Sequence, residues 1–209
     1  GSIYWHMVSK LLLVVQENYF TALDLNADAA ICQQIGDLYY RVRQGIGFNK
    51  TPKQYGAFPA DPYSHTPKHA GARQPGMTGQ VKEEILSRFG ELGVLVKKGA
   101  VHFHLGLLRR REFISDPLPF RYLDVENEWQ VLDVPVFGLA FTWCQVPIVY
   151  CINDELPPGI RVSWVDGKQQ DLQELSLTEA MSAELFSRSN SIRQITLALN
   201  SDLLFDNKD

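Results

Sequence analysis

Several signals that often reveal function are scarce or absent in this sequence. There are only three cysteines, Cys32, Cys144 and Cys151, and no C-x-x-C pair, so the sequence predicts buried free thiols in a reducing compartment. No G-x-S-x-G pattern occurs, and neither a G-x-G-x-x-G motif nor a P-loop is present. The sequence therefore gives no support for a nucleophilic serine, a dinucleotide or a nucleoside triphosphate, and we expect no cofactor.

Long apolar runs and basic tracts are missing as well. The run LLLVV is far too short to span a bilayer, and the only basic run is RRR at 109–111 in a chain of net charge -4. We therefore expect neither a membrane nor a nucleic acid as partner. No signal peptide is visible, which favours a cytoplasmic location. The helical pattern begins at the third residue, which suggests a fragment of a longer chain.

The composition that remains is that of a globular protein, with 209 residues, 45% hydrophobic. Apolar residues at helical spacing predict a helix over 3–20. A second run of apolar residues, from Ile31 to Val42, predicts another helix. Asp24 or Asn26 should cap its N-terminus, and Gly45 and Gly47 should terminate it. The two should form an antiparallel hairpin.

Residues 48–77 show neither the helical nor the strand spacing of apolar residues. This long segment separates the hairpin from a third helix that begins near Thr78 and stops at Gly93. Loops of this length are usually functional or disordered, and the aromatic residues here favour packing. Short alternating runs follow over 94–209, with one helix near 178–186. The fold class expected is α+β: a helical segment over 1–93 and an antiparallel β-sandwich over 94–209.

Two quoted segments resemble a known family. They are QYGAFPADPYSHTPKHAG, in the long loop, and TGQVKEEILSRFGELGVLVKKGAVHFHLGLL, which opens the third helix. Their order is similar to the end of the α/α toroid in the inverting disaccharide phosphorylases, which include cellobiose and chitobiose phosphorylases. Thr78 and Gly79 fall on the Thr-Gly pair that opens the last toroid helix there. The family's SAGWM is QVKEE here, so the choice between phosphate and water stays open.

A second resemblance concerns EEILSR, which is similar to the general-base segment of inverting toroid hydrolases related to glucoamylase. It implies that Glu84 is the catalytic base. A helical wheel with Val81, Ile85, Phe89 and Leu92 on the buried side places Glu84 at its edge and Glu83 opposite, in solvent. The alternative is an i,i+4 ion pair between Glu84 and Arg88.

Further side chains are candidates for binding an oligosaccharide. The helix N-terminus can hold an anion or hydroxyl, aromatic rings can stack on sugar rings, and loop histidines can bond to hydroxyls or phosphate. The alternatives are a plain helix cap, core packing and a turn-forming aspartate. Pro67 between the two histidines excludes helical metal-ligand geometry, so no metal is expected. The expected substrate-binding residues are Tyr4, Trp5, Tyr55, Asp61, Tyr63, His65, His69, Arg73, Thr78, Gly79 and Gln80.

The function expected is that of the C-terminal part of a glycoside hydrolase or glycoside phosphorylase. The family's catalytic aspartate lies upstream of this chain and three helices cannot close a toroid, so the chain alone should be inactive. The remainder of the toroid, or a second copy in a homodimer, would be its partner. The alternative is a non-catalytic carbohydrate-binding or protein-interaction module.

Overall fold

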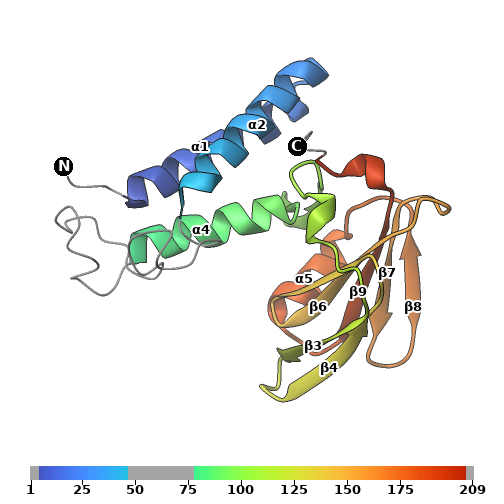
Figure 1. The fold of residues 1–209 in the computed structure, drawn as a ribbon. Helices are drawn as coiled ribbons and strands as arrows, with labels where there is room; N and C mark the ends of the chain where they lie inside the picture. Colours follow the sequence, from blue (N-terminus) through green and yellow to red (C-terminus); the bar gives the residue numbers. More distant parts are fainter. Residues whose placement is uncertain (1–4, 47–77, 206–209) are drawn as a thin grey trace. The chain divides into compact units, whose positions relative to one another are not determined.

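A computed structural model describes residues 5–46 and 78–205 (Figure 1). The fold is α+β: helices come first and sheets follow. The chain divides into two compact units, one that ends at Gly90 and one that begins at Glu91. Each is described by itself below.

The described helices, strands and 3-10 turns are labelled in chain order. They are α1 (Trp5–Asp24), α2 (Ala29–Gly45), α4 (Thr78–Glu91), β1 (Val94–Lys97), β2 (Ala100–Phe103), η2 (Arg110–Glu112), β3 (Leu118–Leu123), β4 (Trp129–Val134), β5 (Gly138–Trp143), β6 (Val146–Ile152), β7 (Gly159–Trp164), β8 (Gln169–Leu172), α5 (Glu179–Ser187), β9 (Ile192–Leu199) and η3 (Ser201–Leu203).

The predicted helical hairpin is confirmed by α1 and α2, which lie against each other (Figure 1). The cap differs from the prediction: Asp28, rather than Asp24 or Asn26, accepts a hydrogen bond from Ala30 N at 2.7 Å. Asn26 instead takes a left-handed backbone, with φ of 51°, in the turn between the helices. Position 24 still belongs to α1, so it could not cap α2.

The buried faces of α1 and α4 are not the apolar stripes that the sequence predicts. On α1, Leu11 is 52% exposed, whereas Ser9 and Gln16 are buried. On α4, Ile85 is 51% exposed, whereas Ser87 is buried. The predicted buried faces are therefore wrong at Leu11 and Ile85, whereas Leu92 is buried as predicted.

The described residues of the second unit form three sheets. β1 pairs with β2 around the turn at Lys98 and Gly99, as the sequence predicts, and β3 pairs with β4. The largest sheet has five strands in the order β5-β6-β9-β7-β8. Its β6–β9 pair is parallel, so the expectation of a purely antiparallel arrangement is wrong at this pair. This parallel pair requires a crossover, and α5 and β7–β8 lie within the connection.

One face of the five-stranded sheet forms the core of this unit. The side chains of Ile148, Tyr150, Val162, Ile195 and Leu197 are all fully buried. Their alternation along β6, β7 and β9 places them on one face, which leaves Val149, Arg161 and Thr196 on the other. The predicted cap of α5 is confirmed, since Thr178 accepts from Met181 N.

The three cysteines are free thiols, as predicted, but the predicted burial is confirmed only for Cys32. Cys32 is buried and Cys144 and Cys151 are half-buried. Burial raises the pKa of the Cys144 and Cys151 thiols, although Arg188 opposes the rise at Cys144. Neither thiol is thereby activated as a nucleophile.

Candidate active site

Most of the predicted substrate-binding residues lie outside the described residues. These are Tyr4, Tyr55, Asp61, Tyr63, His65, His69 and Arg73. The structure describes the backbone of Trp5, Thr78, Gly79 and Gln80, at the starts of α1 and α4, but not their side chains. Their roles therefore remain predictions.

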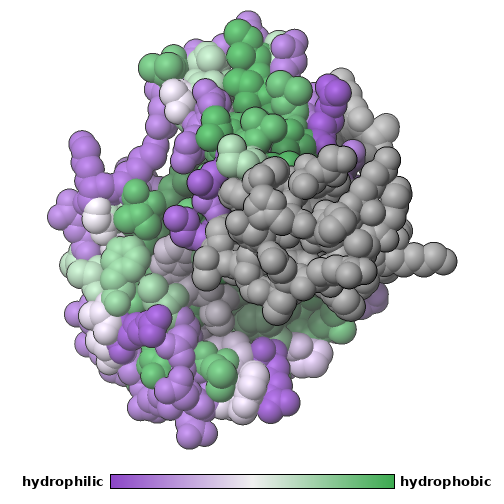
Figure 2. All heavy atoms as spheres, turned by 90° about the vertical axis from the view of Figure 1, so that its left-hand side faces the viewer, coloured by the Kyte–Doolittle hydropathy of each residue, from purple (hydrophilic) through white to green (hydrophobic). Residues whose placement is uncertain are grey.

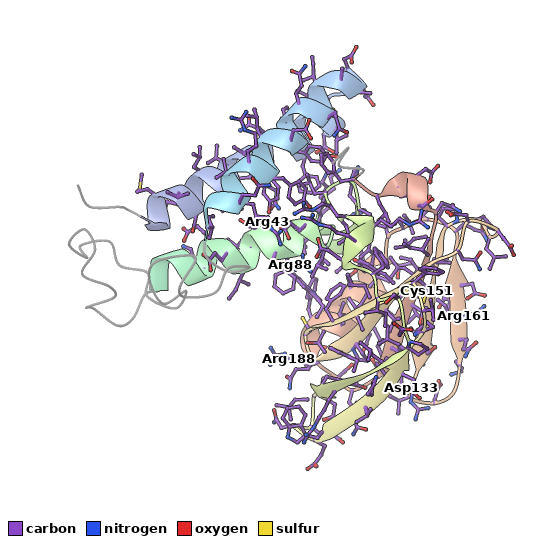
Figure 3. All side chains as sticks on the ribbon, in the orientation of Figure 1. Arg43, Arg88, Asp133, Cys151, Arg161 and Arg188 are labelled. Carbon is purple, nitrogen blue, oxygen red and sulfur yellow. The ribbon has the colours of Figure 1, made fainter. Side chains whose placement is uncertain are left out.

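The two adjacent glutamates of α4 do not lie as the helical wheel predicts. Glu83, expected in solvent, is only 4% exposed, and Glu84 is half-buried. The wheel prediction for Glu83 is therefore wrong, because α4 buries the side that carries Glu83 and Ser87. The expected role of Glu84 as the base stays a prediction. Arg88 lies one turn further along α4 (Figure 3) and is also half-buried.

Buried polar side chains from all three helices make up what we call the polar seam. A side-chain amide connects its parts: Gln16 Nε2 on α1 donates to Ser87 O on α4 at 2.7 Å and to Tyr39 Oη on α2 at 3.3 Å. These two hydrogen bonds connect α1 to both other described helices of this unit. The members of the polar seam are Ser9, Gln16, Tyr39, Arg43, Glu83 and Ser87.

Gly90 on α4 allows this connection to α1 because it has no side chain. A Cβ atom added at Gly90 would lie 2.0 Å from Gln16 Oε1 and 2.3 Å from its Cδ. The amide of Gln16 thus occupies the space that any other residue at position 90 would fill. Glu83, Ser87 and Gly90 recur at helical spacing, which is the sequence signal that could have revealed this face.

Three oxygen atoms of the polar seam are buried without a hydrogen-bond partner in the part of the chain that the structure describes. They are Ser9 Oγ, Glu83 Oε2 and Ser87 Oγ. A buried polar atom with no partner destabilises the fold by about 1–3 kcal/mol, and more when it is charged. The packing of the helices does not need these three atoms. The carboxylate oxygen can accept, and the two hydroxyls can donate or accept, hydrogen bonds with a ligand or water.

The unpartnered carboxylate oxygen lies towards the same end of the helical unit as a buried cation. Arg43 is one turn beyond Tyr39 on α2, and Glu83 is one turn before Ser87 on α4. Because α2 runs opposite to α4 (Figure 1), both steps lead towards the same end. Arg43 is 7% exposed and its guanidinium lies 5.7 Å from the ring centre of Tyr40. That end of the helical unit therefore carries a carboxylate and a cation.

The apolar stripes of the same helices are exposed. On α1 they are Met7, Leu11 and Val14, which are 55%, 52% and 49% exposed, and on α2 Ile31 and Leu38, at 49% and 48%. Figure 2 shows hydrophobic surface in the upper part of the view, at the height of these helices. Such a patch usually marks a contact with another protein segment.

Tyr19, at the far end of the buried face of α1, provides a test of this packing. Burial, with a smaller contribution from Cys32, raises the pKa of its hydroxyl from 10.0 to about 12. The folded state therefore binds the proton more tightly, and this contribution to stability is complete below pH 10 and is lost as the pH rises to 12. The difference in phenolate absorbance between the native chain and Tyr19→Phe should titrate near 12; a midpoint near 10 would contradict the burial.

The second unit has a polar hollow of about 310 Å³ beside the β3–β4 turn. Its carboxylate, Asp124, is already engaged by that turn: it accepts from Glu126 N, Glu128 N and Gln130 Nε2 at 2.8–2.9 Å. These bonds, with that from Glu128 N first, lower the pKa of Asp124. Its role is therefore to hold the turn, and it does not compete with the polar seam as a catalytic candidate.

No cluster of three or more His, Cys, Asp or Glu side chains able to hold a metal ion occurs in residues 5–46 and 78–205. Nor is any helix of these segments both long and apolar enough to cross a lipid bilayer. No protein-family model and no curated protein matches this chain. Among the described residues, the polar seam is the group of buried polar side chains on which the proposal below rests.

Proposed function

We propose that this chain supplies the last helices of an α/α toroid and the C-terminal β-sandwich of an enzyme that cleaves glycosidic bonds. One observation carries the proposal: the helices enclose polar groups, with an unpartnered carboxylate oxygen, and expose their apolar stripes. A helical layer of this kind can complete its apolar contacts only against further apolar segments. The resemblance of roughly 50–108 to toroid enzymes indicates that those segments are the remaining toroid helices.

The chemistry that fits is inversion by two carboxyl groups. An inverting enzyme needs a carboxylate to activate water opposite a carboxylic acid that protonates the leaving oxygen. In a phosphorylase, phosphate takes the place of water, and α4 would contribute to its binding through Thr78 and Gly79. Burial favours Glu83 as the carboxylate of this chain, whereas the resemblance favours Glu84. The general acid would come from the remainder of the toroid.

The test is an assay of the full-length natural protein on neutral di- and oligosaccharides, with and without inorganic phosphate. A reducing sugar released without phosphate indicates hydrolysis, and a sugar 1-phosphate formed only with phosphate indicates phosphorolysis. Either product supports the proposal. The absence of both across α- and β-linked substrates would refute it and favour the non-catalytic alternative.

The exposed stripe of α1 gives a second prediction. Leu11→Glu in the isolated chain should change the free energy of unfolding by less than about 0.5 kcal/mol, because Leu11 is exposed. In the full-length protein the same substitution should lower the free energy of unfolding by about 2 kcal/mol or more, because it buries a charge at the contact with further helices. Urea unfolding of both proteins measures the difference. Lys10→Glu, at the adjacent exposed position, is the control; equal tolerance of Leu11→Glu in both proteins would count against the contact.

A further inference from the structure

A second hollow, of about 540 Å³, lies on the face of the five-stranded sheet opposite the core. Ile160 and Val162 of β7 point into the core, so Arg161 and Ser163 point the other way. The size of the hollow lies within the range of clefts that bind small molecules. We call it the sheet hollow.

The floor of the sheet hollow consists of two rows of polar side chains that cross three strands. Strand pairing aligns Asp171, Arg161 and Thr196 in one row. It aligns Gln169, Ser163 and Gln194 in the next row on the same face. Six side chains capable of hydrogen bonding therefore lie side by side on β8, β7 and β9.

The charges in this floor cancel. Among the described residues, Arg161 and Asp171 are the only charged ones that line the hollow. They form a bidentate pair, with Nε–Oδ1 at 2.7 Å and Nη2–Oδ2 at 3.1 Å. Arg161 lies on β7 (Figure 3). The pair holds the guanidinium in place, and the other polar groups are neutral amides and hydroxyls. A phosphate or an acidic peptide finds no free cation here, whereas hydroxyl groups find both donors and acceptors.

One end of the sheet hollow is apolar and open. Gly159 and Ala198 face each other across β7 and β9 and fill little space, and Leu156, Pro157 and Pro158 form the adjoining wall. From Gln194 to Ala198 the floor extends over four residues, about 13 Å, longer than a single sugar ring. An apolar wall beside rows of neutral polar groups is complementary to a sugar chain, which has C–H faces and hydroxyl edges.

We propose that the sheet hollow binds a neutral oligosaccharide without cleaving it. This goes beyond the function proposed above, because it involves no residue of the polar seam and no catalytic group. The sheet hollow would hold a polysaccharide chain while another part of the protein acts on it. The isolated chain should therefore bind, whatever the outcome of the activity assay.

The test is to titrate the isolated chain separately with cellotetraose, maltotetraose and chitotetraose. Calorimetry measures the heat of binding, and NMR measures the shifts of the amide signals. We expect binding of at least one probe at up to millimolar concentration, with shifts at β7, β8 and β9. Gln194→Ala combined with Gln169→Ala should weaken binding about tenfold, and Ala198→Met should block it by filling the space. Gln44→Ala, at an exposed position of α2, is the control and should bind as the native chain does.

Three results would overturn the proposal. One is the absence of heat and shifts with all three probes; another is unchanged binding in Ala198→Met with an intact fold. The third is stronger binding of inorganic phosphate or of a β-strand peptide than of any saccharide, with shifts along β8, which lies at the edge of the sheet. A matching thermal unfolding midpoint in each variant shows that its fold is intact.

Discussion

Glu83→Gln in the full-length protein is expected to reduce hydrolysis of the glycosidic bond by about 10²–10⁴-fold, the range typical for loss of a general base. Glu83 is 4% exposed, and its Oε2 has no hydrogen-bond partner among the described residues. An oxygen in that state contributes no hydrogen bond to the packing of the helices. Removal of its charge should therefore not weaken the fold.

The variant separates catalysis from structure because the two roles move the measurements differently. If Glu83 is catalytic, kcat falls while the unfolding midpoint stays or rises by up to about 2–4 °C, equivalent to about 1 kcal/mol. If Glu83 is structural, the unfolding midpoint falls, and the measured activity falls only because less of the protein is folded. Glu84→Gln is the matched variant on the same turn of α4. A full loss of kcat in Glu84→Gln, with Glu83→Gln active, would transfer the role to Glu84, as the resemblance implies.

Gly93→Ala is expected to have the largest effect on stability, about 3 kcal/mol or more. Gly93 has φ of 77°, a left-handed conformation that other residues adopt at a cost of about 1–2 kcal/mol. In addition, a Cβ atom there would lie 2.4 Å from the backbone oxygen of His104. His104 N donates to Gly93 O at 2.8 Å, so this backbone cannot move away without breaking that bond. Overpacking adds about 1–3 kcal/mol.

Gly99→Ala is the control for Gly93→Ala. Gly99 has nearly the same conformation, with φ of 80°, but an added Cβ atom would meet nothing within 4 Å. It should therefore show the conformational effect alone, about 1–2 kcal/mol. Urea unfolding of the two variants measures the difference. Equal losses would show that the backbone near His104 yields, contrary to the structure.

The features predicted correctly from the sequence are those that depend on local chemistry. Gly93 ends the third helix, Lys98 and Gly99 form a hairpin turn, and Thr178 caps α5, each because its conformation or its hydrogen bond is set by a few neighbouring residues. The order of helices followed by strands was predictable for the same reason.

Strand boundaries without a turn signal were not predictable. The segment 139–152 reads as one strand but forms β5 and β6, which turn at Cys144 and Gln145 with φ of 51° and 66°. Neither residue is the glycine, asparagine or aspartate typical of such a turn. The same holds for β8, whose polar sequence gives no alternating apolar pattern and whose place depends on pairing with β7.

The polar seam was not predicted because the spacing of the apolar residues points to the opposite face. The apolar residues Leu11 and Ile85 set the period of α1 and α4, yet they are exposed, and the buried positions carry Gln16 and Ser87. A helical wheel locates the face that an apolar partner covers. It identifies the interior only when that partner is part of the same folded unit. The position of Glu83 thus emerged only from the structure.

Turnover of one oligosaccharide by the isolated 209-residue chain, compared with turnover by the full-length natural protein, tests the central claim most directly. The claim is that this chain carries part of an active site that further helices complete. We predict cleavage by the full-length protein and none by the isolated chain at the same molar concentration. Turnover by the isolated chain would contradict the claim, since the general acid would then have to lie within these residues.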